Sequence, residues 1–266
     1  MRLFTPLRPN PDALLARVNP SVKLGAAVLV MLALFASADA VTAAIVLAGL
    51  AAATSYSGLA PGALLGRTWP LLLAALSVGI LNTLFAPAQA GSPLRIGPVA
   101  VGSENVVAGI GLGLRLLGIA YSGVLALATT DATDLADSLV QQLRLSPRFA
   151  VGALAGARLL PILADEWQIL SLARRARGVE AGRSPVAAVR LFFGQLLGLL
   201  VAAVRRATRL ATAMESRGFG ALPRRTTARP QVVQRSDWML LGATAGLAVL
   251  AIAVSVALGT WRFIFG

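Results

Sequence analysis

Five stretches of this sequence are apolar over roughly the length of a membrane-crossing helix, and each carries at most one charged residue. An α-helix needs about 20 apolar residues to cross the hydrocarbon core of a bilayer. Only 13% of the 266 residues are charged, against about 25% in a typical soluble domain. We therefore expect an all-α polytopic membrane protein with about five transmembrane helices. The predicted spans are residues 22–38, 40–57, 69–86, 106–129 and 238–258.

The connections between these spans differ in length. Only a turn at Asp39 separates the first two spans, which predicts a helical hairpin. Residues 58–68 and 87–104 are expected to be loops. Gly109 and Gly113 predict a close helix contact, because small residues four apart let two helices approach each other. The same spacing recurs at Gly152 and Gly156, Gly194 and Gly198, and Gly242 and Gly246.

The distribution of cations predicts the orientation, because loops on the cytoplasmic side are enriched in Arg and Lys. The start of the chain holds Arg2, Arg8, Arg17 and Lys23, and Arg67 follows the second span. The N-terminus is therefore expected to be cytoplasmic. Lys23 is the only lysine, and this bias toward arginine is not evidence of function by itself.

The segment between the fourth and the last predicted span is strongly basic. Residues 130–237 hold 16 of the 24 Arg and Lys residues, so the charge rule places them on the cytoplasmic side. We predict three parts: an N-terminal membrane block of four spans (1–129), a cytoplasmic domain of long helices (130–237) and a C-terminal membrane span (238–266).

Two long helices are predicted within the basic segment from the signals at their ends. Ser146-Pro147 and Ser184-Pro185 each place a hydroxyl side chain at an N-cap and proline at the first helical position. Ala176-Arg177-Gly178 and Ser216-Arg217-Gly218 each place glycine where a left-handed C-terminal cap is expected. Each helix would run from its proline to its arginine, over about 45 to 50 Å.

An alternative topology has seven or eight spans, because residues 191–204 are apolar enough to suggest another crossing. Arg190 and Arg205 bracket this window, which at 14 residues is nearer in length to a buried or interfacial helix. A crossing there would also move the cations of residues 217–229 to the outside. The five-span topology is therefore favoured.

Helix capping alone explains one arginine at a helix end, since the helix dipole favours a cation there by about 0.3 to 1 kcal/mol. Here the Arg-Gly end recurs forty residues later, at Arg217-Gly218, on a second long helix. Two equivalent ends suggest two equivalent partners. A planar guanidinium pairs with a carboxylate through two hydrogen bonds, so each end suits docking onto an acidic groove.

Several short segments share their pattern with one family of membrane proteins. They are Asn19-Pro20-Ser21-Val22-Lys23-Leu24, Gly113-Leu114-Arg115-Leu116, Ala128-Thr129-Thr130, Leu143, Pro147, Arg158-Leu159-Leu160-Pro161, Glu166, Gly218-Phe219-Gly220 and the two Arg-Gly ends. In these segments the chain resembles, over nearly its whole length, the transmembrane T component of energy-coupling factor (ECF) transporters. The paired Arg-Gly ends are the most specific part. The family's Ala-Arg-Gly is intact at residues 176–178, but Ser216 replaces the alanine in the second copy.

The resemblance implies an ATP-driven importer in a prokaryotic cell membrane. Two ABC-type ATPase subunits and one small membrane S component would be its partners, and the S component would select a vitamin or transition-metal ion. The ATPases would bind ATP and Mg, leaving no cofactor or metal in this chain. The residues implied to couple to the ATPases are Ala176, Arg177, Gly178, Ser216, Arg217 and Gly218. The residues expected to contact the S component are Leu191, Phe192, Phe193, Leu196, Leu197 and Leu200.

The residue types also exclude several kinds of site. The chain has no Cys and no His, which excludes disulfides, thiolate or imidazole metal sites and a Ser-His-Asp triad. It has no P-loop motif, so ATP hydrolysis is expected in other subunits. Asp131, Asp134 and Asp137 could suggest a metal site, but their spacing by three fits an exposed helix face near a helix start.

The alternative function is a polytopic membrane enzyme with a site at the cytoplasmic face. A nucleic-acid partner is not expected, although the isoelectric point is about 11.8. The positive-inside bias already accounts for the arginines.

Overall fold

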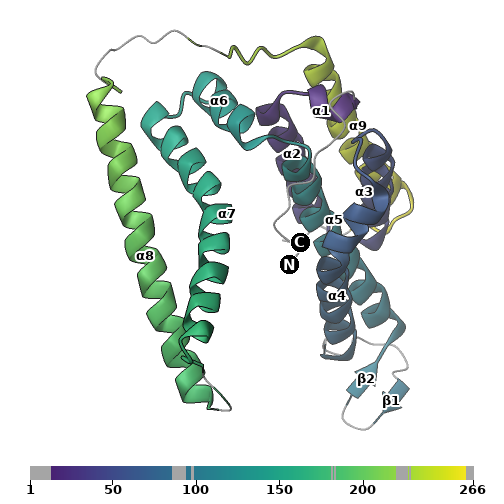
Figure 1. Ribbon diagram of the computed structural model, residues 1–266. Coiled ribbons are helices and arrows are strands. Elements are labelled where there is room, and N and C mark those ends of the chain that lie inside the picture. The colour runs from purple at the N-terminus through teal and green to yellow at the C-terminus, as the bar shows by residue number, and fades with distance from the viewer. Residues whose placement is uncertain are drawn as a thin grey trace. The chain divides into compact units, whose positions relative to one another are not determined.

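The computed structural model describes residues 13–85, 94–96, 99–180, 182, 184–219, 227 and 229–261. Within these residues the chain forms nine helices and one two-stranded hairpin (Figure 1). It divides into two compact units: unit 1 is Met1–Leu135 with Gln231–Gly266, and unit 2 is Ala136–Pro230.

Unit 1 contains most of the helices, and α6 crosses the division into unit 2. Its elements are α1 (Leu14–Arg17), α2 (Pro20–Ala36), α3 (Ala40–Ser55), α4 (Pro61–Phe85), β1 (Leu94–Ile96), β2 (Val99–Val101), α5 (Ser103–Ala128) and α9 (Arg235–Ala257). The antiparallel strands β1 and β2 lie within the segment for which we expected a loop, and Leu94 pairs with Val101. Unit 2 contains the long helices α7 (Pro147–Ala176) and α8 (Pro185–Ser216), which follow α6 (Ala132–Gln142).

Five of the described helices are long and apolar enough to cross a membrane: α4, α5, α7, α8 and α9. This confirms an all-α polytopic membrane protein. The number agrees with the prediction, but the set of helices differs. The apolar helices α2 and α3 have only 17 and 16 residues, whereas α7 and α8, which we assigned to the cytoplasmic side by their flanking arginines, pass the length and hydropathy test.

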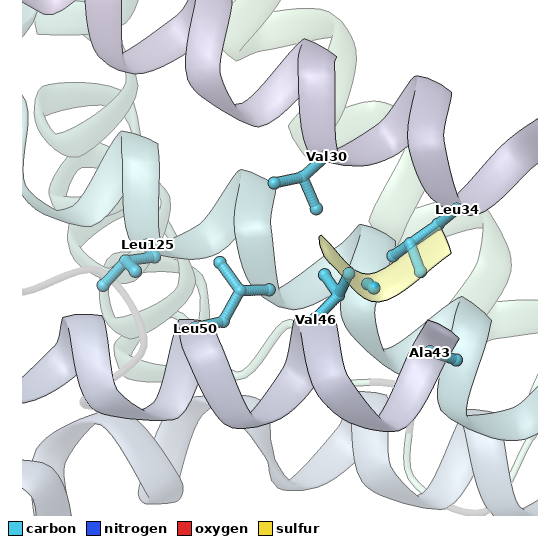
Figure 2. Packing of buried hydrophobic residues seen from close by; sticks show 7 residues of the cluster. Val30, Leu34, Ala43, Val46, Leu50 and Leu125 are labelled. Atoms are coloured by element: carbon cyan, nitrogen blue, oxygen red, sulfur yellow. The ribbon is translucent and has the colours of Figure 1, made fainter. Parts of the chain in front are cut away.

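The core of unit 1 lies where α2, α3, α5 and α9 meet. Figure 2 shows side chains of α2 and α3 directed toward one another, with one side chain of α5 beside them. The cluster consists of Val30, Leu34, Ala43, Val46, Leu50, Leu125 and Ala251. Many other apolar side chains are exposed, as expected for helices whose outer surface faces lipid rather than water.

The first two apolar helices are joined by a short turn at Asp39, as predicted, but they pack mainly against α5 and α9 and touch each other at few positions. The Asp39 carboxylate accepts hydrogen bonds from Thr42 N (2.7 Å) at the start of α3 and from Ser255 Oγ (2.7 Å) of α9. The Ser37 hydroxyl also donates to it. Burial alone would raise the pKa of Asp39, but these hydrogen bonds hold it below its ordinary value of 3.8. The turn is therefore held by an ionised carboxylate at neutral pH.

One sequence-based expectation for unit 1 is wrong. The predicted loop at residues 58–68 is mostly helix, because α4 begins at Pro61, a residue suited to the first helical position, and continues through Pro70. Lys23, which we counted among the cations at the start of the chain, is buried to 4% exposure. Lys23 is therefore a structural cation inside the unit rather than a solvated one.

Arg115 is a second buried cation and lies in the middle of α5. Its guanidinium donates from Nη2 to the carbonyl oxygen of Phe35 (2.7 Å) and lies 5.3 Å from the centre of the Phe35 ring. Phe35 is in the last turn of α2, where carbonyls lack helical partners. Arg115 thus caps α2 from the neighbouring helix.

The close helix contact predicted at Gly109 and Gly113 is confirmed, and α4 is the partner of α5 there. A Cβ on Gly109 would lie 2.5 Å from the Gly79 carbonyl oxygen, and it would also meet Thr83 Oγ1. A Cβ on Gly113 would lie 3.0 Å from the Ala75 carbonyl oxygen. The other glycine pairs do not make such contacts within the described residues: Gly152, Gly156, Gly198, Gly242 and Gly246 have open space, and Gly194 has only the Arg174 side chain near it.

We expect Gly109→Ala to destabilise unit 1 by about 1 to 3 kcal/mol, because the backbones of α4 and α5 must separate to admit the methyl group. Gly123→Ala in the same helix is the matched control, since a Cβ there meets nothing within 4 Å. This control should stabilise by up to about 1 kcal/mol, the helix-propensity gain of alanine over glycine. Thermal unfolding in detergent measures both changes, and equal effects would contradict the proposed contact.

Candidate functional site

The two long helices of unit 2 begin and end where the sequence signals predict. Pro147 and Pro185 are their first residues, and Arg177 and Arg217 are their C-caps. The Ser184 hydroxyl accepts a hydrogen bond from Ala187 N (3.3 Å), whereas Ser146 makes no such cap. Pro161 lies inside α7 without interrupting it.

The helices α7 and α8 form an antiparallel pair. Gln195 Nε2 donates to the Trp167 carbonyl oxygen (2.7 Å), and Arg174 Nη1 donates to the Leu191 carbonyl oxygen (2.9 Å). Glu166 and Arg206 form a salt bridge at 2.7 Å. Figure 1 shows the two helices close together near the turn that joins them and further apart toward their other ends.

The C-terminal end of α7 is a Schellman motif, in which glycine adopts a left-handed conformation. Gly178 has φ +71°. Its N–H donates to the Arg175 carbonyl oxygen (2.9 Å), and Val179 N–H donates to the Arg174 carbonyl oxygen (3.0 Å). This is the pair of hydrogen bonds that defines the motif. Arg177 is therefore fixed at the tip of the helix by the backbone.

The end of α8 repeats this geometry. Gly218 has φ +69°. Its N–H donates to the Glu215 carbonyl oxygen (2.9 Å), and Phe219 N–H donates to the Met214 carbonyl oxygen (2.9 Å). The replacement of alanine by Ser216 leaves the motif unchanged, since the Ser216 hydroxyl donates to the Ala213 carbonyl oxygen of its own helix (3.0 Å).

Both helix-end arginines are exposed. Among the described residues, neither the Arg177 nor the Arg217 guanidinium has a hydrogen-bond or ion-pair partner. Because the helices are antiparallel and α7 has 30 residues, the two tips lie at opposite ends of the pair, about 45 Å apart at 1.5 Å per residue. One small partner cannot contact both tips, so the geometry presents two separate exposed arginines.

The glycine caps can be tested separately from the arginines. A Cβ at Gly178 or Gly218 would meet nothing within 4 Å, so Gly178→Ala and Gly218→Ala add only left-handed backbone strain. We expect each to destabilise its helix end by about 1 to 2 kcal/mol. Amide hydrogen exchange should show faster opening of residues 174–179 or 214–219, with the remainder of α7 and α8 protected as before. Unchanged exchange at these ends would contradict the capping role.

The six residues expected to contact the S component lie on α8 and differ in exposure. Leu191 is half-buried, and Phe192 packs against Trp167 of α7 with ring centres 5.3 Å apart. Phe193 and Leu197 are 60% and 63% exposed, and Leu196 and Leu200 are also exposed. Leu191 thus contributes to packing within the pair, Phe192 contacts Trp167 and is also 49% exposed, and the other four form an apolar surface that the rest of the described chain leaves uncovered.

A groove of about 420 Å³ separates the first half of α7 from the last half of α8. Its walls include small residues on both helices, and Arg148, Glu215 and Phe219 lie at one end. Residues that line its middle are Gly152, Ala155, Gly156, Ala207 and Ala211. The predicted small-residue pair Gly152 and Gly156 therefore differs in role from the α4–α5 contact, since both residues line an open groove.

The aspartates near the start of α6 act as helix-end residues. Asp131 Oδ1 accepts a hydrogen bond from Thr133 N (2.7 Å), and Asp134 lies in the first turn, where the helix dipole favours acids. Over the part of the chain that the structure describes, no three Asp or Glu side chains are grouped so as to hold a metal ion.

Comparison with known proteins gives one consistent family. The sequence model described as "CbiQ: Cobalt transport protein" matches residues 12–228, which include both Arg-Gly ends. Curated proteins named energy-coupling factor transporter transmembrane protein EcfT are similar. That of Heliobacterium modesticaldum is 30% identical over 192 residues, covering 68% of this chain and 70% of the relative. That of Thermanaerovibrio acidaminovorans is 32% identical over 200 residues (70% and 72%), and that of Streptococcus equi subsp. equi is 26% identical over 261 residues (95% and 92%).

Proposed function

The chain belongs to the CbiQ/EcfT family of transmembrane components of energy-coupling factor transporters, and on this premise we propose that it couples two separate ATPase subunits to a substrate-binding S component. In this proposal Arg177 and Arg217 each dock into an acidic groove of one ATPase. The units of the chain provide the membrane scaffold and the coupling helices.

The observation that carries the proposal is the repeated geometry of the two helix ends. Both tips have the same cap, both present an exposed arginine, and they lie at opposite ends of an antiparallel pair. A rigid helix transmits a displacement at its tip along its whole length. Closure of an ATPase dimer would move both tips together and tilt α7 and α8.

The apolar surface of α8 supports a site for the S component. Phe193, Leu196, Leu197 and Leu200 expose large side chains on the helix that would tilt. Tilting would therefore reorient a membrane protein bound there. The transported substrate would be a vitamin or transition-metal ion selected by the S component, and ATP and Mg would bind only to the ATPases.

The proposed orientation places the N-terminus and unit 2 on the cytoplasmic side, where ATP is available. The arginines that flank α7 and α8 favour this side. In this arrangement α7 and α8 lie at the membrane surface, although their length and hydropathy would permit a crossing. Protease accessibility of residues 177–184 from the cytoplasmic side of membrane vesicles tests the orientation, and protection from that side would contradict it.

Gentle purification of the tagged chain, followed by mass spectrometry, tests the partner composition. We expect two ABC-type ATPase subunits, each with a P-loop, and one small polytopic membrane protein. A chain that purifies without ATPases and shows enzymatic activity alone would favour the alternative, a polytopic membrane enzyme.

A further inference from the structure

The first turn of α2 contacts both segments by which the chain passes between unit 1 and unit 2. Asn19 binds the segment that returns from unit 2 into α9, and Lys23 binds the segment that leaves α5 for α6. We infer that Asn19 and Lys23 form a clamp, here called the α2 clamp, which fixes the points where the chain leaves and re-enters unit 1 and so transmits movement of the coupling helices to the helices of unit 1. The inference extends the proposed function and rests on it for its consequence in transport.

The first connection is held through the side chain of Lys23. Its ammonium group donates to the carbonyl oxygen of Thr129 (2.7 Å), the C-cap of α5 and the third residue before α6. Lys23 and Thr129 are 4% and 3% exposed. The Thr129 hydroxyl donates back to the Leu125 carbonyl oxygen (2.9 Å), so the end of α5 is capped on both sides. A hydrogen bond from a buried cation is stronger than one between neutral groups.

The second connection is held through Asp237 in the first turn of α9. Asp237 Oδ1 accepts a hydrogen bond from Asn19 N (3.0 Å), across 218 residues of sequence, and Oδ2 accepts one from Gln234 N (2.7 Å). The side chain is 1% exposed. The carboxylate thus joins the start of α2 to the start of α9 and to the residues that precede it.

Both connections therefore converge on one helical turn. The chain passes between unit 1 and unit 2 at these two segments, so a motion of unit 2 that reaches them acts on the clamp. The helix α2 in turn packs into the core that α3, α5 and α9 share. Buried ionic groups in a membrane protein are costly, and they are retained where they serve function. In this inference the clamp transmits movement of the coupling helices to the membrane helices.

Spin labels measure the effect directly, because the chain contains no native cysteine. Tyr56→Cys in unit 1 and Leu160→Cys in unit 2 place labels at exposed positions. In the full chain in lipid nanodiscs, Lys23→Met should broaden the distance distribution between the labels at least about twofold, since a charged hydrogen bond of this kind shifts an opening equilibrium by about tenfold or more. Lys23→Arg should restore the narrow distribution, because a cavity of about 180 Å³ beside Lys23 leaves room for the longer side chain.

Ser122→Ala is the matched control, because Ser122 lines the same cavity and its hydroxyl donates to Ile119 O of its own helix (2.8 Å). Its distribution should equal that of the unsubstituted chain. If Lys23→Met does not fold, Asp237→Asn removes the charge that accepts the hydrogen bond from Asn19 N and should broaden the distribution as well. An unchanged width in the folded variants would overturn the clamp.

The consequence for transport is measured on the complete transporter. Lys23→Met should lower uptake per ATP hydrolysed by about tenfold while the ATPases stay bound and their hydrolysis rate changes by less than about twofold. An unchanged ratio would overturn the coupling role. Lys23→Met should not release the ATPases. If the ATPases are absent even when the unsubstituted chain is purified, the proposed function is contradicted, and the spin-label result still stands.

Discussion

Reversing both helix-end charges, with Arg177→Glu and Arg217→Glu, is expected to release the ATPase subunits and abolish substrate uptake. Each substitution replaces an attraction to an acidic groove by repulsion. Loss of one partner of a close charge pair costs about 2 to 5 kcal/mol, which lowers affinity by about 30-fold or more at each tip. Co-purification of the ATPases with the tagged chain and uptake by intact cells provide the two measurements.

A double control with the same change in net charge is available on α8. Arg190 and Arg209 are exposed and lie near opposite ends of the pair, but neither is at a cap. Arg190→Glu with Arg209→Glu should keep both ATPases and most of the uptake. Full ATPase binding and uptake in the Arg177 and Arg217 double variant would contradict docking at the tips, whereas equal losses in test and control would show only a general charge effect.

The helix ends could be predicted from the sequence because their signals are local. Proline at the first position and glycine after the last turn act through the backbone of the same few residues. The predicted bounds of α7 and α8 therefore agree with the structure within one residue. The Schellman geometry at Gly178 and Gly218 follows from the same glycines. The docking role of the arginines stays a prediction, because capping explains the position of each glycine equally well.

The contacts of Lys23 could not be predicted in the same way. A lysine at the start of an apolar stretch fits the charge rule, and nothing in the local sequence shows that it is buried. Its partner Thr129 lies 106 residues away, and the partner of Asn19 lies 218 residues away. The local signals concern helix starts: Asn19-Pro20 begins α2, and Gln234 and Asp237 form a capping box at the start of α9. Such long-range polar contacts depend on the packing of four helices.

Hydropathy also fails to assign α7 and α8 to the membrane or to its surface. Their apolar residues satisfy the composition of a span, yet the same residues would suit a surface that binds another membrane protein. Charge at the flanks favours the surface, because Arg190 and Arg205 limit the uncharged window of α8 to 14 residues, fewer than the roughly 20 that a bilayer-spanning helix needs.

Introducing charge on the exposed surface of α8, with Phe193→Glu and Leu197→Glu, is expected to release the S component while the ATPases stay bound. The two residues lie four apart on one helix face, and both side chains are more than half exposed. Burying an unpaired carboxylate in an apolar interface costs several kcal/mol, so capture of the S component should fall by more than about tenfold. Leu197 is 20 residues from Arg217 along α8, about 30 Å, so the ATPase docking point should be unaffected.

Phe193→Leu with Leu197→Met keeps the surface apolar and should preserve uptake. If the glutamate variant still co-purifies with the S component, this surface faces lipid or solvent instead, and the S component must bind another part of the chain.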